Sequence, residues 1–126
     1  MNAHSKLEYT CFDVEIEDAV AHIRLKRPEA MNTMIPAFWR ELPQIVRQID
    51  QEALARCIVI SSTGRHFSAG MDLAVFGAGG SSRKPTSSDM HIENEARRHH
   101  VRALQDCFGC LDEARMPVLA AIQGGC

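Results

Sequence analysis

The sequence has few aromatic residues, almost no charge imbalance and no long hydrophobic run. Aromatic side chains make up 6% of the 126 residues, and the formal net charge is -2 at pH 7. Without a basic stripe, the chain lacks the electrostatic signature of a nucleic-acid-binding protein. No apolar run approaches the roughly 20 residues that a membrane-spanning helix needs. The remaining composition, 45% hydrophobic and 24% charged, is that of a globular protein.

The sequence also lacks a cysteine framework and an apolar signal core. Five cysteines are an odd number, and their spacing is irregular, which favours reduced thiols over disulfides. The first six residues, MNAHSK, are polar, unlike a secretory signal. We therefore expect a cytoplasmic protein in which residues 1–10 are loosely held and residues 11–126 belong to one domain.

Hydrophobic periodicity predicts the order of the structural elements. Residues 12–16 and 20–25 alternate between apolar and polar side chains, as the two strands of a β-hairpin do. A helix is predicted to follow, because apolar residues recur on one helical face. Two apolar runs, residues 57–60 and 118–122, predict buried strands, and residues 88–113 predict a long helix between them. The class expected from this order is α/β.

Residues 61–73 hold the most informative stretch. They follow the buried run and precede a short apolar segment, residues 73–76, which indicates a strand, a tight loop and a short helix. Gly64 can supply a positive φ for the turn. Asp72 stands where the helix would begin and can cap it. An ordinary strand-to-helix turn explains the same spacing.

The chemical interpretation of this loop is an oxyanion site. Ala69 and Gly70 are small enough to let a ligand approach the main chain. The amides of Gly70, Met71 and Asp72 would then point out of a helix N-terminus, where negative charge on oxygen can be held.

Three other features suggest rival chemistries. The Gly- and Ser-rich residues 77–88 lack the Gly-Lys-Ser/Thr ending of a phosphate-binding loop, and a lid is the better interpretation. His99 and His100 point in different directions on a helix, so we expect no metal there. Cys107 and Cys110 form a C-x-x-C late in a predicted helix, where core packing is favoured over redox chemistry.

Residues 67–73, FSAGMDL, resemble the F-x-A-G-x-D-L oxyanion-hole segment of the enoyl-CoA hydratase/isomerase (crotonase) superfamily. Three further stretches are similar to the family in the same order: residues 20–32 to its first hairpin strand and R-P-x-x-x-N turn, 56–64 to its central strand and turn, and 116–126 to its K-P-V-I-A-A-I-x-G strand. Together they cover nearly the whole chain. Residues 37–42 and 123–126 look most like the delta(3,5)-delta(2,4)-dienoyl-CoA isomerase subfamily.

The resemblance implies a spiral of ββα units and an enzyme of fatty-acid or related acyl-CoA breakdown. Two backbone amides would hold the thioester oxygen, the first of them from Met71, and CoA would be part of the substrate rather than a separate cofactor. The implied reaction is isomerisation of 3,5-dienoyl-CoA to 2,4-dienoyl-CoA. The alternatives are an enoyl-CoA hydratase and a non-catalytic remnant that binds acyl-CoA or oligomerises. The residues placed at CoA or the thioester are Lys26, Arg27, Ala30, Ser68, Ala69, Gly70, Met71, Asp72 and Leu73.

The resemblance further implies that this chain is the N-terminal half of a domain. A complete domain would need on the order of another hundred residues, and the family's catalytic carboxylates would lie among them, after Cys126. We therefore expect the 126-residue chain by itself to be inactive. The resemblance also implies a homotrimer or a dimer of trimers.

Overall fold

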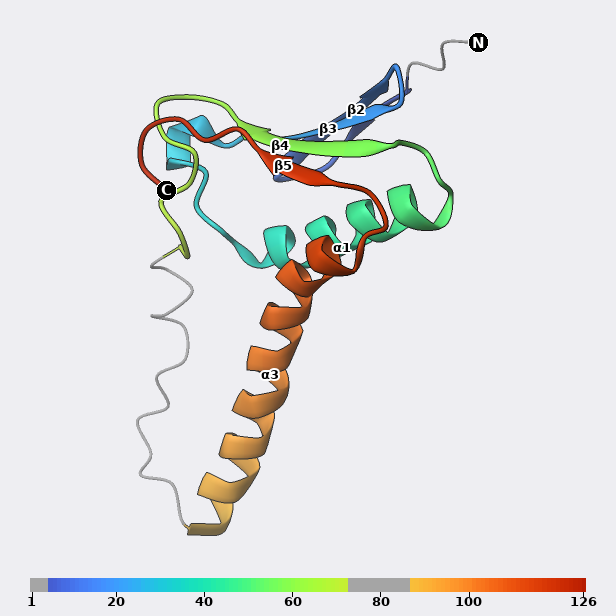
Figure 1. Ribbon diagram of the computed structural model, residues 1–126. Coiled ribbons are helices and arrows are strands. Elements are labelled where there is room, and N and C mark those ends of the chain that lie inside the picture. Colours follow the sequence, from blue (N-terminus) through green and yellow to red (C-terminus); the bar gives the residue numbers. More distant parts are fainter. Residues whose placement is uncertain (1–4, 73–86) are drawn as a thin grey trace.

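The computed structural model describes residues 5–72 and 87–126, with side chains from residue 7 and from residue 90 onward in these two ranges. A mixed sheet lies over helix α1, and helix α3 runs away from both (Figure 1). The α/β class is confirmed, while the short helix expected at residues 73–76 lies outside the described ranges. The elements in chain order are β1 (Ser5–Glu8), β2 (Phe12–Glu17), β3 (Val20–Leu25), the 3₁₀ turn η1 (Pro28–Ala30), α1 (Pro36–Gln51), β4 (Cys57–Ser62), α3 (Ser87–Glu113) and β5 (Val118–Ala120).

The five strands follow one another across the sheet in chain order. Strands β1, β2 and β3 pair antiparallel, whereas β3 with β4 and β4 with β5 pair parallel. The predicted hairpin is confirmed, and its turn residues Asp18 and Ala19 have φ values of 52° and 64°, which match the twist of a tight hairpin. Parallel pairing of β3 with β4 requires a crossover, and α1 supplies it.

Residues 5–8 fall within the N-terminus that was expected to be loosely held. They form β1, which pairs with β2 from Ser5 opposite Ile16 to Glu8 opposite Asp13. The pairing depends on main-chain hydrogen bonds along an open strand edge, so the polar composition of these residues does not reveal it.

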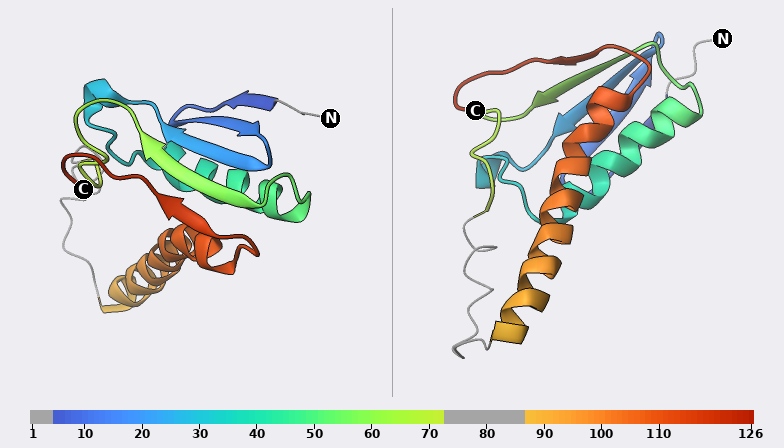
Figure 2. Two further views of the ribbon diagram at one scale, coloured as in Figure 1. Left: turned by 45° about the horizontal axis from the view of Figure 1, so that its top comes forward. Right: turned by 60° about the horizontal axis from the view of Figure 1, so that its bottom comes forward.

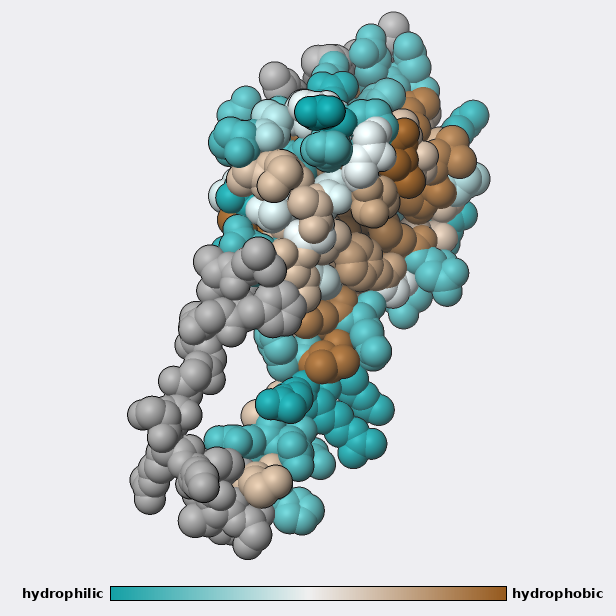
Figure 3. Space-filling view, turned by 90° about the vertical axis from the view of Figure 1, so that its left-hand side faces the viewer, coloured by the Kyte–Doolittle hydropathy of each residue, from teal (hydrophilic) through white to brown (hydrophobic). Residues whose placement is uncertain are grey.

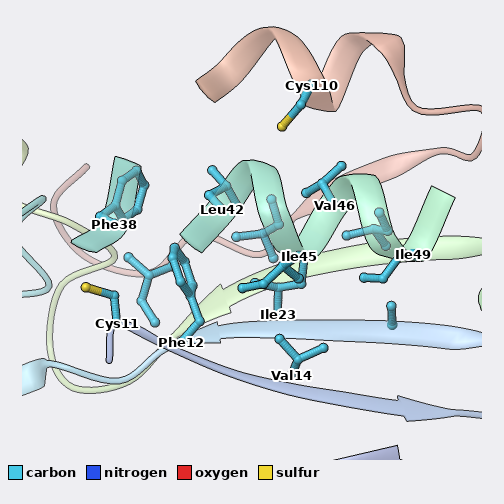
Figure 4. Close-up of a cluster of buried hydrophobic side chains, with 14 of the residues drawn as sticks. Cys11, Phe12, Val14, Ile23, Phe38, Leu42, Ile45, Val46, Ile49 and Cys110 are labelled. Carbon is cyan, nitrogen blue, oxygen red and sulfur yellow. The ribbon is translucent and has the colours of Figure 1, made fainter. Parts of the chain in front are cut away.

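The hydrophobic core lies between the sheet and α1 (Figure 4). Phe12, Val14, Ile23 and Ile58 project from the strands and are at most 1% exposed, and α1 covers them with residues such as Ile45. Each fully buried side chain of this kind stabilises the fold by about 1.5–3 kcal/mol. The helical face predicted from the periodicity is therefore the face that packs on the sheet.

Two predictions of fully buried strands are wrong. In β4, Ile58 and Ile60 are buried but Val59 is only half-buried. In β5, which ends at Ala120 rather than at the predicted residue 122, Leu119 is 57% exposed. The reason is that α1 and the end of α3 cover one face of the sheet in the described ranges, and β5 is an edge strand (Figure 2).

Helix α3 contacts the body of the molecule only near its C-terminal end. Cys107 and Cys110 are buried, whereas Ile92 is 70% and Val101 43% exposed. Polar surface covers most of the visible outer part of this helix, and apolar surface gathers on the body (Figure 3). No helix in the described ranges has the length and apolar character needed to cross a membrane.

Candidate functional site

The loop after β4 turns sharply at Gly64. Its φ is +83°, and a Cβ atom built there would lie 2.6 Å from the Cβ of Pro28. Any other residue would therefore be strained by its backbone and would clash with η1. This confirms the expected positive φ, and it shows that η1 presses directly against the turn.

The side chain of Asn32 forms hydrogen bonds with the same turn. Its side chain is buried at 2% exposure. Its Oδ1 accepts a hydrogen bond from the Arg27 amide at 2.9 Å, and its Nδ2 donates to the carbonyl oxygens of Thr63 at 2.8 Å and His66 at 3.1 Å. One amide side chain thus joins the η1 turn to the loop that carries the site.

We call residues 67–72 the site segment and residues 123–125 the glycine turn. The first amides of the site segment bind the glycine turn: the Phe67 amide donates to the carbonyl oxygens of Gln123 at 2.8 Å and Gly125 at 3.0 Å, and the Ser68 amide to Gly125 at 3.4 Å. These bonds anchor one end of the site segment to the loop after β5.

The next two amides of the site segment are also occupied. The Ala69 amide donates to the Met31 carbonyl at 3.0 Å, and the Gly70 amide donates to the Ser68 hydroxyl at 3.1 Å. Ser68 is 4% exposed, and its hydroxyl donates in turn to the Asn32 carbonyl at 2.9 Å. The Ser68 side chain is therefore committed to holding the main chain in place.

Met71 forms a parallel bridge with Met34. Met34 makes both bonds: its amide donates to the Gly70 carbonyl at 2.8 Å, and its carbonyl accepts from the Asp72 amide at 3.2 Å. In such a bridge the opposite residue directs its own N–H away from the pair. Within residues 5–72 and 87–126 the Met71 amide forms no hydrogen bond.

The structure thus corrects the expectation of three available amides. The amides of Gly70 and Asp72 donate hydrogen bonds to other residues of the chain. Among the amides of the site segment, that of Met71 is the one without a hydrogen bond in the described ranges. The Asp72 carboxylate accepts a hydrogen bond from the Thr33 hydroxyl at 3.3 Å. Leu73 and residues 77–86 of the lid predicted at residues 77–88 lie outside the described ranges. The last two residues of that prediction, Ser87 and Ser88, begin α3 instead of continuing a loop.

An apolar cavity of about 180 Å³ lies beside the site segment. Phe67 and Ser68 line it from the segment, Met34 from its isolated bridge with Met71, and Phe38 and Phe108 from the two helices. The ring centroids of Phe38 and Phe108 are 6.1 Å apart. This arrangement offers an apolar ligand group a place beside Phe67 and Ser68 of the site segment.

The two predicted phosphate-binding cations already have protein partners. The Lys26 ammonium lies 3.1 Å from the Asp13 carboxylate, and the Arg27 guanidinium donates to the Thr33 carbonyl at 3.0 Å. Both side chains keep further N–H donors. Ala30 ends η1 and is half-buried.

The rival thiol chemistry is disfavoured by burial. Burial raises the pKa of Cys107 to about 12 and also raises the pKa of Cys110, whereas a reactive thiol needs a lowered pKa. The Cys110 thiol donates to the Cys107 carbonyl at 2.9 Å, so both side chains pack in the core as expected. His99 and His100 are exposed, and the described residues contain no group of three metal-ligating side chains.

Sequence reasoning missed the residues that support the site. Asn32, His66 and the glycine turn hold the site segment, but the sequence motifs contain them without marking a role for any of them. The buried asparagine after an R-P-x-x-x turn was the available signal, because a polar residue closing such a turn often bonds back to the main chain. No comparable local signal marks His66.

Known proteins match the chain over most of its length. The enoyl-CoA hydratase/isomerase family model matches residues 15–126. The mitochondrial delta(3,5)-delta(2,4)-dienoyl-CoA isomerase of Homo sapiens is 33% identical over 85% of this chain and 32% of its own length. The hydroxycinnamoyl-CoA hydratase-lyase of Pseudomonas fluorescens is 30% identical over 90% of this chain and 38% of its own length.

Solved structures share the fold. A Thermobifida fusca protein assigned as an enoyl-CoA hydratase and crystallised with CoA superposes with a TM-score of 0.72 at 32% identity. The match covers 90% of this chain and 42% of that protein. The chain therefore spans less than half the length of the proteins that it resembles.

Proposed function

The chain belongs to the enoyl-CoA hydratase/isomerase family, and from that membership we propose that the site segment binds the thioester carbonyl of an acyl-CoA through the Met71 amide. The observation that carries this proposal is that the other amides of the site segment are used in internal hydrogen bonds and the Met71 amide is not. The amides from Phe67 to Gly70 and that of Asp72 are bonded internally, and Met71 directs its amide away from its bridge partner. A donor held rigidly by its neighbours needs no reorganisation when a ligand arrives.

The proposed chemistry is stabilisation of a thioester enolate. When a proton leaves the carbon next to the carbonyl, negative charge moves onto the carbonyl oxygen, and a fixed N–H stabilises that charge more than it stabilises the neutral substrate. Removing one such donor typically costs about 3 kcal/mol of transition-state stabilisation. The Met71 side chain takes no part in this step.

The remaining parts of the substrate have proposed places as well. The cavity beside Phe67 takes the apolar acyl chain, because its lining is apolar and it adjoins the site segment. Lys26 and Arg27 contribute their unused donors to the phosphates of CoA. CoA enters as part of the substrate, and we propose no separate cofactor.

The proposed reaction is conversion of 3,5-dienoyl-CoA to 2,4-dienoyl-CoA. One proton leaves C2, the double bonds move by one position, and a proton is delivered to C6, so the atoms balance without a co-reactant. The similarity to the human isomerase supports this choice. The similarity to a bacterial hydratase-lyase supports addition of water to a 2-enoyl-CoA as the second candidate.

Carboxylates placed around the enolate decide between these reactions, because proton transfer and water activation both need a general acid or base. We propose that they come from outside the described residues, since Asp72, the acidic residue of the site segment, is bonded to Thr33. A protein ending at Cys126 is accordingly proposed to bind acyl-CoA without turning it over.

The test compares two substitutions at Met71 in the full-length protein. Met71→Pro removes the amide hydrogen, whereas Met71→Leu keeps it with a similar side chain. With 3,5-dienoyl-CoA as substrate, kcat/KM of the proline variant should fall by about 10²–10³ relative to the leucine variant. Retained affinity for CoA itself would show that the proline variant is folded. Equal activity of the two variants would exclude the Met71 amide as the donor.

A further inference from the structure

Two neighbouring segments hold the site segment from opposite ends. Residues 31–34 bind its later part, through the bridge at Met71 and the bonds to Ala69 and Asp72. The glycine turn binds its first part through Phe67 and Ser68. The position of the Met71 amide therefore depends on both supports.

The glycine turn is itself held by the side chain of His66. The imidazole Nδ1 accepts a hydrogen bond from the Gly125 amide at 2.8 Å. The Gly125 carbonyl accepts a hydrogen bond from the amide of Phe67, which is the residue that follows His66. A closed set of hydrogen bonds thus links His66, Phe67 and Gly125, with one side-chain acceptor in it.

The shape of the turn also matches the imidazole ring. A Cβ atom added at Gly125 would lie 3.1 Å from Nδ1 of His66, and one added at Gly124 would lie 2.9 Å from Nδ1 and 2.2 Å from the Arg65 carbonyl oxygen. Gly124 also has a φ of +62°. Both positions therefore admit only glycine without displacement of the ring or the backbone.

The bond identifies the tautomer of the neutral ring. A nitrogen that accepts a hydrogen bond carries no proton, so the neutral imidazole has its hydrogen on Nε2. His66 is half-buried, and no salt bridge joins it to another residue in the described part of the chain.

We propose that His66 is a positioning residue that holds the glycine turn against the site segment by accepting the Gly125 amide hydrogen, and thereby fixes the direction of the Met71 amide. The catalytic consequence rests on the proposed function of Met71. The structural part, that His66 orders the glycine turn and the Phe67 amide, stands on the hydrogen bonds alone.

The experiment uses two variants of the full-length protein. His66→Asn places a carbonyl oxygen close to where Nδ1 lies, and so keeps an acceptor without the imidazole ring. His66→Phe replaces the imidazole by another aromatic ring, which has no nitrogen to accept the hydrogen bond. The readouts are hydrogen exchange of the Gly125 and Phe67 amides, the ¹⁵N shifts of the wild-type imidazole, and kcat and KM with 3,5-dienoyl-CoA.

In His66→Phe we expect both amides to exchange about fivefold to tenfold faster, as loss of one hydrogen bond predicts. We expect kcat to fall with KM changed less, and His66→Asn to recover most of both effects. The imidazole shifts should show a hydrogen on Nε2 and none on Nδ1.

Three results would overturn the proposal: unchanged exchange in His66→Phe, a hydrogen on Nδ1 in the wild type, or no recovery in His66→Asn although it is folded. Faster exchange with unchanged kcat would overturn the catalytic consequence. If the wild-type protein bound and converted no acyl-CoA, the proposed function would fail, while the exchange data would still decide the role of His66.

Discussion

Helices α1 and α3 both carry an apolar face, but only α1 buries it. Seven of the 16 residues of α1 are buried. In the longer α3, the buried side chains within the described ranges are Cys107 and Cys110. Apolar periodicity thus indicates that a helix forms and which face is apolar, while the neighbouring elements decide whether that face is covered.

The candidate site depends on the better-packed of these two regions. The site segment continues from β4, whose Ile58 lies in the core beneath α1, and it bridges to residues just before α1. Helix α3 reaches the site near its C-terminal end, where Phe108 and Leu111 line the cavity. Perturbing α1 should therefore disturb stability and the site together, whereas the outer part of α3 should tolerate change.

The largest contrast is expected from deleting one apolar side chain in each helix. Ile45→Ala in α1, where the side chain is 2% exposed, should cost about 2–5 kcal/mol, because a cavity is left in a packed core. Val101→Ala in α3, where it is 43% exposed, should cost under about 0.5 kcal/mol. Urea unfolding of both variants measures the difference. Similar losses would mean that the exposed face of α3 is covered in solution.

A second contrast compares a buried asparagine with an exposed one. Asn32→Ala leaves the Arg27 amide and the carbonyls of Thr63 and His66 without their partner, which should cost about 1–3 kcal/mol. Asn32 also has a φ of 51°, where alanine is disfavoured. Asn94→Ala on α3 is the matched control and should be neutral. Hydrogen exchange should quicken from Thr63 to Gly70 in the first variant alone.

The thiols test the packing of α3 near its C-terminal end, where the buried Cys107 and Cys110 lie. Because burial raises the pKa of Cys107 to about 12, this thiol should be alkylated far more slowly at pH 8 than the exposed Cys126. The unfolded thiol ionises near its usual pKa of 9.0, so the free energy of unfolding should fall as the pH rises from there towards 12. Cys107→Ala should flatten that decline. Rapid alkylation of Cys107 in the native protein would contradict the packing of α3.

The smallest effect is expected at the surface pair that joins the two helical regions. The Arg115 guanidinium donates to the Asp50 carboxylate at 2.9 Å and holds the pKa of that carboxyl below its usual value. A carboxyl whose pKa is lowered by folding stabilises the folded state at pH values above its pKa in the unfolded chain. This contribution should therefore vanish as the pH falls through the acid range and the Asp50 carboxyl is protonated. Arg115→Gln should lower Tm less than the Asn32 and Ile45 variants do, because the pair is exposed. A Tm loss as large as theirs, or one that persists at low pH, would argue against this.

Local patterns were enough to predict the elements around the core. The alternation in β2 and β3, the apolar face of α1 and the glycine at position 64 each reflect a constraint that acts over a few residues. The identity of the available donor, Met71, came from the resemblance, and the structure supplied the physical basis for it by showing how the neighbouring amides are used. The phosphate role of Lys26 and Arg27 stays a prediction.

The order of the elements from β2 to β5 in the described ranges, the apolar face of α1, the turn at Gly64 and the family were readable from the sequence. Tertiary contacts were needed to show which groups remain unused. These contacts pair β1 with β2, leave one face of β4 half-buried, occupy the amides of Gly70 and Asp72, and bring His66 to Gly125, 59 residues along the chain. Periodicity is a local property of the chain, whereas hydrogen-bond partners and burial depend on distant segments that meet only when the chain has folded.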